Sequence, residues 1–291
     1  MRKKETDVIM AYQFTKIAVK VGSNVLTRRD GTLDVTRVSA LVDQIAELHK
    51  AGVEVVLISS GAVASGRSEI KVSRKLDNVE QRQLYSAVGQ AKLINRYYEL
   101  FREHGIAVGQ VLTTKESFAT RRHYLNQRNC MRVMLETGVI PIVNENDTIS
   151  VTELMFTDND ELSGMIASML DVQALIILSN IDGIYNGSPS QPGTSVIREV
   201  EHGKDLSDYI QTEKSGFGRG GMLTKTTIAR KVADEGITVI IANGKRKIFY
   251  SICCSIPMKR SVRVLFLLPK LCRVSRSGLL TAKDLPKENC T

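Results

Sequence analysis

The chain has no apolar run that approaches the roughly 18 residues a membrane-spanning helix needs. The apolar stretch behind its basic N-terminus is also too short for a signal peptide. Cysteine is scarce before residue 245: only Cys130 is present, and no C-x-x-C pair or Cys/His cluster has zinc-site spacing. These absences argue against a membrane protein, a disulfide scaffold and a zinc domain, and they predict a cytoplasmic protein.

Motifs of several enzyme classes are missing as well. No G-x-S-x-G elbow supports acyl transfer, and no Walker P-loop is present. Gly216 to Gly221 match G-x-G-x-x-G, the dinucleotide-binding fingerprint. That fingerprint must follow a buried strand, and no buried strand precedes these glycines. The four histidines are His49, His104, His123 and His202, and none of them falls in a motif. We therefore expect each to be a surface residue and not a metal ligand.

Acidic residues are scarce at the C-terminal end. Residues 245–291 contain eleven Lys or Arg and two acids, so they carry the whole net charge of +9. We therefore divide the chain into a main domain, 1–244, and an atypical basic, Cys-rich tail, 245–291, which is not a typical native domain ending. Because the domain itself is neutral, we expect no nucleic acid partner for it.

The tail has no sustained period of 2 or 3.6 residues. It is either a basic segment that binds nucleic acid or an acidic surface, or a segment under no fold-level selection, such as out-of-frame translation. We expect it to pack poorly against the domain, except that the apolar stretch 262–268 can be captured as an edge strand.

Buried strands alternate with amphipathic helices along the rest of the chain. Apolar runs predict strands at 16–21, 53–58, 139–143, 174–178 and 237–242, and 3.6-residue periodicity predicts helices at 36–51, 80–104, 160–170 and 222–235. The expected buried face of the helix at 80–104 carries Leu84, Ala87, Val88, Ala91, Ile94, Tyr97 and Phe101. The alternation predicts a three-layer α/β/α sandwich with a mostly parallel central sheet.

Four of the predicted strands run directly into polar clusters. These clusters are Gly22-Ser23, Ser59-Ser60-Gly61-Ala62, Asn144-Glu145-Asn146-Asp147 and Ser179-Asn180-Ile181-Asp182-Gly183. Ligands of open α/β sheets bind beyond the carboxyl ends of the strands. The pattern therefore predicts a small-molecule site built from separate strand ends.

Three features have both a functional and a purely structural interpretation. Lys20, inside the first strand, either neutralises a phosphate or faces water on an edge strand. The glycines of 215–221, which precede Lys225, either close on phosphate oxygens or form a plain flexible loop. The acids of 158–160 either only cap the following helix or also orient lysines and hold magnesium near phosphates.

Five motifs occur in an order and spacing that resemble the amino acid kinase family over about residues 14–244. They are Lys20-Val21-Gly22-Ser23, Ser59-Ser60-Gly61-Ala62, Asn144-Glu145-Asn146-Asp147, Asp158-Asn159-Asp160 and Gly220-Gly221-Met222-Leu223-Thr224-Lys225. The segments 83–90 and 125–128 are similar to the glutamate-phosphorylating members. The resemblance implies phosphoryl transfer from ATP, with Mg²⁺, to the γ-carboxylate of L-glutamate, which gives L-glutamyl 5-phosphate in the first step of proline biosynthesis.

The resemblance also implies roles for individual residues. Lys20, Lys225 and Asp160 would be catalytic, and Ser60, Asp147, Asn159 and Asn144 would bind glutamate. The nucleotide would be held by Lys20, Ser179, Asn180, Arg219, Gly220, Gly221, Met222, Leu223, Thr224 and Lys225. No metal ligand is assigned.

The resemblance further implies that residues 1–244 form an amino acid kinase domain, that the chain is a homo-oligomer and that proline is a feedback inhibitor. The RNA-binding-like C-terminal domain that many members add is not recognisable here, and the short apolar runs predict no membrane partner. Two alternatives stay open. The chain could be an inactive or regulatory amino-acid-binding relative, or it could be another family member that acts on acetylglutamate, carbamate or uridylate.

Overall fold

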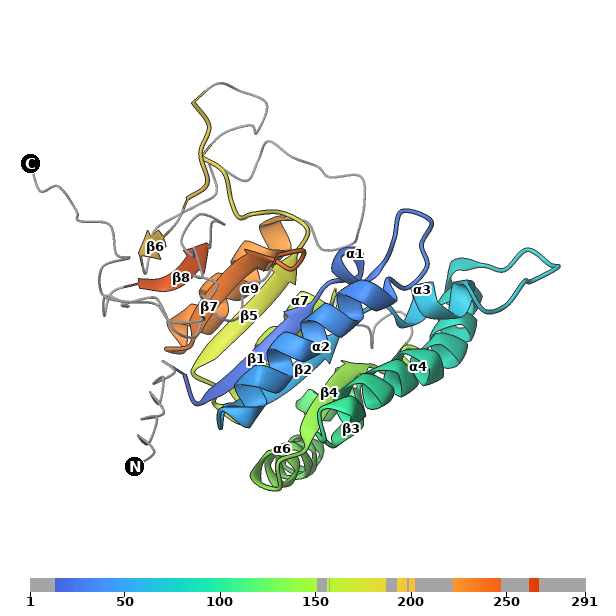
Figure 1. Cartoon of the computed structure of the whole chain (residues 1–291), viewed down its shortest axis with the longest axis horizontal. Helices are drawn as coiled ribbons and strands as arrows, with labels where there is room; N and C mark the ends of the chain where they lie inside the picture. Colours follow the sequence, from blue (N-terminus) through green and yellow to red (C-terminus); the bar gives the residue numbers. More distant parts are fainter. Residues whose placement is uncertain are drawn as a thin grey trace, which may run out of the picture.

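The structure is a computed structural model. An eight-stranded sheet forms its centre (Figure 1). The structure describes residues 14–150, 156, 158–186, 193–197, 199–201, 222–246 and 262–266. The strand order is β3-β4-β2-β1-β5-β7-β8-β6, and every neighbouring pair is parallel except β6 with β8. The strands are β1 Lys16–Val21, β2 Glu54–Ser59, β3 Val108–Thr113, β4 Ile140–Glu145, β5 Ala174–Ser179, β6 Glu199–Glu201, β7 Thr238–Asn243 and β8 Val262–Phe266.

Helices cover both faces of this sheet and complete the predicted three-layer sandwich (Figure 1). Side chains of α2 and α4 pack in the core on one face, and side chains of α6, α7 and α9 pack in the core on the other. The described helices are α1 Ser23–Leu26, α2 Val35–Lys50, α3 Ala62–Arg67, α4 Asn78–Glu103, α5 Glu116–Ala119, α6 Arg121–Glu136, α7 Asn159–Leu170 and α9 Met222–Asp234. The predicted fold class is confirmed.

Strand β1 lies between β2 and β5, so it is a central strand. Because successive side chains alternate, Ile17, Val19 and Val21 enter the core beneath α2, and Ala18 enters the core beneath α7 and α9. Lys20 follows Ala18 on the second face and is 5% exposed. The interpretation of Lys20 as a water-facing edge residue is therefore wrong.

The buried face of α4 differs from the predicted one. Tyr97 and Phe101 are fully buried as expected, but Leu84, Ala87 and Ala91 are exposed. The residues that turn inward instead are the small Ser86 and Gly89, together with Leu93. Small residues are needed there because α4 lies against the short helix α3, whose backbone it approaches closely.

Six described elements have no counterpart in the prediction: α1, α3, β3, α5, α6 and β6. Strand β3 is the sheet edge, and its side chains are mostly half-buried or exposed, so it lacks a continuous apolar run. Only two residues of α6 are buried, Met131 and Leu135, which leaves a weak helical pattern. Helix α3 is six residues long and has no full period to detect.

A strand does form inside the basic tail, at β8. It pairs in parallel with β7 and antiparallel with β6, so it is not the edge strand that we predicted; β6 takes that place. The expected poor packing of the tail concerns mainly 247–261 and 267–291, which lie outside the described residues.

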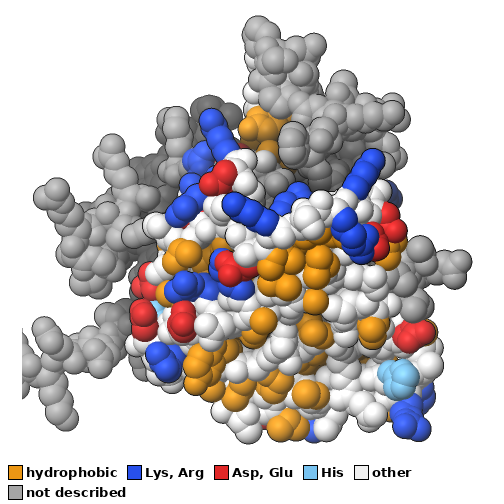
Figure 2. Space-filling model, turned by 90° about the vertical axis from the view of Figure 1, so that its right-hand side faces the viewer, with side chains coloured by type: hydrophobic (Ala, Val, Ile, Leu, Met, Phe, Trp, Pro, Cys, Tyr) orange, Lys and Arg blue, Asp and Glu red, His pale blue; other side chains and the backbone are white. Residues whose placement is uncertain are grey.

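The described surface is mixed in character. On the side shown in Figure 2, basic side chains gather toward the top, and hydrophobic side chains are scattered across the middle and lower parts. Within the described residues, no helix is both long and apolar enough to cross a membrane.

Candidate active site

The polar strand ends meet at one edge of the sheet, as predicted. Val21 at the end of β1 is in register with Ser59 of β2 and Leu178 of β5. Gly22 follows directly, and its N–H donates to the Leu178 carbonyl at 3.2 Å. The carboxyl ends of parallel strands therefore present Ser60, Asp147 and Asn180 from three separate parts of the chain.

The centre of the site is a carboxylate between two lysines. Asp160, in the first turn of α7, forms an ion pair with Lys20, whose Nζ lies 2.5 Å from Oδ1. Its Oδ2 accepts a hydrogen bond from Lys225 Nζ at 2.7 Å. The Asp160 side chain is 1% exposed, and the two lysine side chains are 6% and 12% exposed. Lys225 lies in the first turn of α9, so one strand and two helices supply the three charges.

Burial and charge oppose each other at these groups. Burial, reinforced by the charge of Lys225, lowers the pKa of Lys20 more than Asp160 raises it. Burial would by itself raise the pKa of Asp160, but the two lysines outweigh it and hold that pKa below its ordinary value. The three charges leave one buried positive charge in excess, which suits an anion that carries several oxygens.

Asp158 caps the helix that carries Asp160. Its Oδ1 accepts the backbone N–H groups of Asp160 and Glu161 at 2.9 and 3.1 Å. Burial, together with the neighbouring charge of Asp160, raises the pKa of Asp158. Its Oδ2 is buried and accepts no hydrogen bond from a described residue. The segment 158–160 therefore does more than cap α7, because Asp160 also contacts both lysines.

Three predicted substrate-binding residues share one hydrogen-bond network. Asn159 Nδ2 donates to Ser60 Oγ at 2.8 Å and to Asn144 Oδ1 at 3.1 Å. Asn144 Nδ2 in turn donates to Gln90 Oε1 of α4 at 2.8 Å. Asn159 thus ties together the ends of β2 and β4, which the sequence separates by more than 80 residues.

Helix α4 also supports the end of β2 next to Ser60. The hydroxyl groups of Tyr97 and Ser59 share a hydrogen bond of 2.9 Å. Burial raises the pKa of Tyr97 to about 12, so its hydroxyl keeps its proton at neutral pH. A hydrogen bond between two neutral hydroxyl groups therefore links the end of β2, next to Ser60, to α4.

Asp147, the fourth predicted substrate residue, is held by an arginine of α4. Arg82 Nε donates to Asp147 Oδ1 at 2.6 Å, and Arg82 Nη2 donates to Glu145 Oε2 at 2.5 Å. Sequence reasoning did not single out Arg82, because its partners lie 63 and 65 residues away. Its only signal was that it directly precedes the segment 83–90, which is similar to the glutamate-phosphorylating members.

A pocket of about 480 Å³ lies in front of these groups. This volume falls within the range of about 300–1,000 Å³ that small-molecule sites occupy. It is lined by Ser23, Ser60, Gly61, Ala62, Val63, Ala64, Arg67, Asn78, Gln81, Arg82, Asn144, Glu145, Asp147, Phe156, Asp158 and Asn159. All four predicted substrate residues line it, and Asp158 and Asn159 connect it directly to Asp160.

The predicted nucleotide residues are only partly described. Ser179 and Asn180 follow β5, where Ser179 Oγ donates to Asn180 Oδ1 at 3.4 Å, and Thr224 precedes Lys225 on α9. Met222 and Leu223 are in the first turn of α9. Arg219, Gly220 and Gly221 lie outside the described residues.

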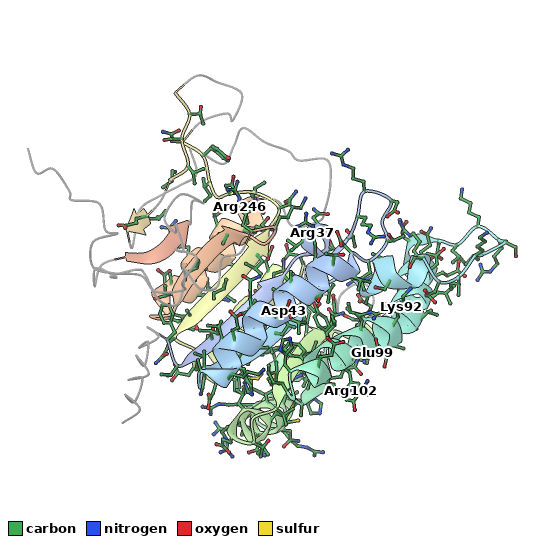
Figure 3. All side chains as sticks on the ribbon, in the orientation of Figure 1. Arg37, Asp43, Lys92, Glu99, Arg102 and Arg246 are labelled. Atoms are coloured by element: carbon green, nitrogen blue, oxygen red, sulfur yellow. The ribbon has the colours of Figure 1, made fainter. Side chains whose placement is uncertain are left out.

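An ion pair that we did not predict lies close in sequence to Ser179 and Asn180, two of the predicted nucleotide residues. Asp182 accepts Asn243 Nδ2 at 2.9 Å and Arg246 Nη2 at 2.9 Å (Figure 3 labels Arg246). These contacts link the segment after β5 to the end of β7.

Comparisons with known proteins agree with this geometry. Residues 15–243 match the family model described as the amino acid kinase family. The chain is 85% identical over 237 residues to a glutamate 5-kinase of Bacteroides thetaiotaomicron, a match that covers 81% of this chain and 66% of that relative. It is 53% identical to a glutamate 5-kinase of Chlorobaculum tepidum, over 79% of this chain and 64% of the relative.

Two further similarities concern length and fold. A glutamate 5-kinase of Clostridium acetobutylicum is 36% identical, over 80% of this chain and 88% of the relative. The solved structure of a UMP kinase from Bacillus anthracis superposes with a TM-score of 0.55 at 14% identity, over 88% of this chain and 96% of that one, and it supports the fold alone. The chain spans about two thirds of the length of the first two relatives.

Proposed function

The chain belongs to the amino acid kinase family, and we propose that it is a glutamate 5-kinase, which phosphorylates the γ-carboxylate of L-glutamate with ATP. The observation that carries this proposal is the buried Lys20–Asp160–Lys225 cluster beside a polar pocket. The names of the similar proteins support the choice of glutamate.

The arrangement suits phosphoryl transfer between two substrates that meet at Asp160. Glutamate would occupy the pocket at the ends of β1, β2 and β4, and ATP would lie at the ends of β5 and β7. An oxygen of the γ-carboxylate attacks the γ-phosphorus, and the bond to the bridging oxygen breaks with its electrons passing to ADP. Lys20 and Lys225 would stabilise the charge on the transferring group, because such transfer depends on positioning and electrostatics.

Mg²⁺ would enter with ATP in this proposal. Magnesium bound to nucleotide phosphates needs only one or two protein carboxylates. Asp158, whose Oδ2 is buried and accepts no hydrogen bond from a described residue, fits this role. Within the described part of the chain, no three His, Cys, Asp or Glu side chains converge as a metal site.

The reaction can be tested directly with the purified chain. With glutamate, ATP, Mg²⁺ and hydroxylamine, we expect glutamyl hydroxamate, because an acyl phosphate reacts with the amine. Aspartate, carbamate and UMP serve as control acceptors, and release of ADP is measured for each of them, because phosphorylated UMP is not an acyl phosphate and gives no hydroxamate. Turnover of one of these without turnover of glutamate would refute the substrate, and glutamate binding without any ATP consumption would favour the inactive or regulatory alternative.

The substrate half of the pocket predicts a selective binding defect. Asp147→Ala removes a carboxylate that the ammonium group of glutamate can meet, so we expect the KM for glutamate to rise about 10- to 100-fold. The KM for ATP should change little, because Asp147 lines the pocket that we assign to glutamate. Steady-state kinetics with each substrate varied in turn measure both constants, and equal losses for the two substrates would contradict this role.

The remaining expectations belong to this proposal. They are the homo-oligomer and proline as feedback inhibitor, which the family resemblance supports, and a cytoplasmic location, which was predicted from the short apolar runs of the sequence.

A further inference from the structure

We propose that Arg82 is a positioning residue that sets Asp147 in the orientation in which it binds the substrate, and this rests on the proposed function. The geometry carries the inference. Arg82 projects from α4 and meets two carboxylates at once, Asp147 through Nε at 2.6 Å and Glu145 through Nη2 at 2.5 Å.

The burial of these groups makes the arrangement specific. The Glu145 side chain is 4% exposed, the Asp147 side chain 10% and the Arg82 side chain 20%. Two carboxylates this close repel each other in a buried place unless a cation lies between them. A guanidinium presents donors in a fixed planar fork, so it fixes the direction of both carboxylates as well as their charge.

Glu145 extends the effect of Arg82 to two residues that follow Asp147 in the chain. Its Oε1 accepts Ser150 Oγ at 2.6 Å and the backbone N–H of Phe156 at 2.9 Å. Glu145 therefore holds both Ser150 and Phe156. Arg82, bound to the other oxygen of the same carboxylate, ties these two residues to α4.

The same contacts argue against direct substrate binding by Arg82. Its Nε and Nη2 already donate to protein carboxylates at short distances, so its charge is neutralised inside the protein. The group of this cluster that is suited to a substrate ammonium is the carboxylate of Asp147, on the wall of the pocket. Arg82 thus acts through Asp147.

Kinetics of Arg82→Ala and Arg82→Lys test this role. We expect Arg82→Ala to raise the KM for glutamate about 10- to 100-fold, the loss that a misplacement of about 1 Å can cause. Turnover at saturating glutamate and the KM for ATP should stay within about threefold. Arg82→Lys keeps the charge without the fork, so it should restore only part of the affinity.

A matched control exists on the same helix. Arg96 pairs with Glu99 at the surface of α4 at 3.0 Å (Figure 3 labels Glu99), so Arg96→Ala removes an arginine ion pair away from the pocket. We expect Arg96→Ala to leave both KM values unchanged. Thermal unfolding of all variants shows whether Arg82→Ala is folded. If it is not, the KM values of Arg82→Lys, alone and combined with Asp147→Asn, test the positioning role.

A double-mutant cycle separates positioning from direct contact. If Arg82 acts through Asp147, replacing Arg82 by lysine in an Asp147→Asn background should raise the KM for glutamate by less than about twofold more. Additive effects would overturn the inference, and so would an unchanged KM in Arg82→Ala or an equal loss for glutamate and ATP. Calorimetric binding of glutamate without ATP repeats the comparison. A wild-type chain that neither binds nor phosphorylates glutamate would overturn the proposed function itself.

Discussion

Lys20→Ala is expected to lower turnover by about 10²- to 10³-fold, the usual effect of removing one preorganised charge from a transition state. Lys20 is buried on a central strand and contacts Asp160 at 2.5 Å, so no other described side chain takes its position. The KM for glutamate should rise much less, because the pocket residues stay in place. Lys225→Ala should behave in the same way, since Lys225 approaches Asp160 from α9 at 2.7 Å.

The control for this experiment lies at the start of the same strand. Lys16 forms a half-exposed ion pair with Glu54 at 3.3 Å, and Lys16→Ala should leave turnover unchanged. The hydroxamate assay at saturating substrates measures all three variants. A lysine variant with normal turnover and a raised KM for glutamate would show that the lysine binds substrate and does not stabilise the transferring group.

Gly89→Ala is expected to lower the free energy of unfolding by about 3 kcal/mol, the upper part of the range for overpacking. A Cβ at Gly89 would lie 1.8 Å from the Ala62 carbonyl oxygen, and a Cβ at Gly66 would lie 1.8 Å from the Tyr85 carbonyl oxygen. Both obstacles are backbone atoms, so α3 and α4 would have to separate. Because α3 lines the substrate pocket, the KM for glutamate should rise as well.

Denaturant unfolding measures this effect, with Ala91→Ser as control. Ala91 is exposed on the same helix, so one added atom there should change the free energy of unfolding by less than about 0.5 kcal/mol. Equal stabilities of Gly89→Ala and wild type would show that the two helices can move apart without cost.

Much of this fold can be predicted from local patterns. Continuous apolar runs predicted five strands of the parallel sheet, and the residues that follow four of them do form one polar edge. Parallel strands explain this success, because burial on both faces leaves long apolar runs, and equal direction brings their carboxyl ends together. The five motifs likewise identified the family that the comparison found.

The sequence alone left the position of Lys20 undecided and gave the wrong buried face for α4, and only the packing of the chain resolved both. The strand of Lys20 could be central or edge, and pairing with β2 and β5 made it central. The inward face of α4 was mispredicted because α3 and the pocket, and not the main core alone, cover that helix. Arg82 follows the same rule: its carboxylate partners are 63 and 65 residues away. Periodicity reports how apolar a helix face is, whereas ion pairs and backbone contacts depend on which distant segment packs against it.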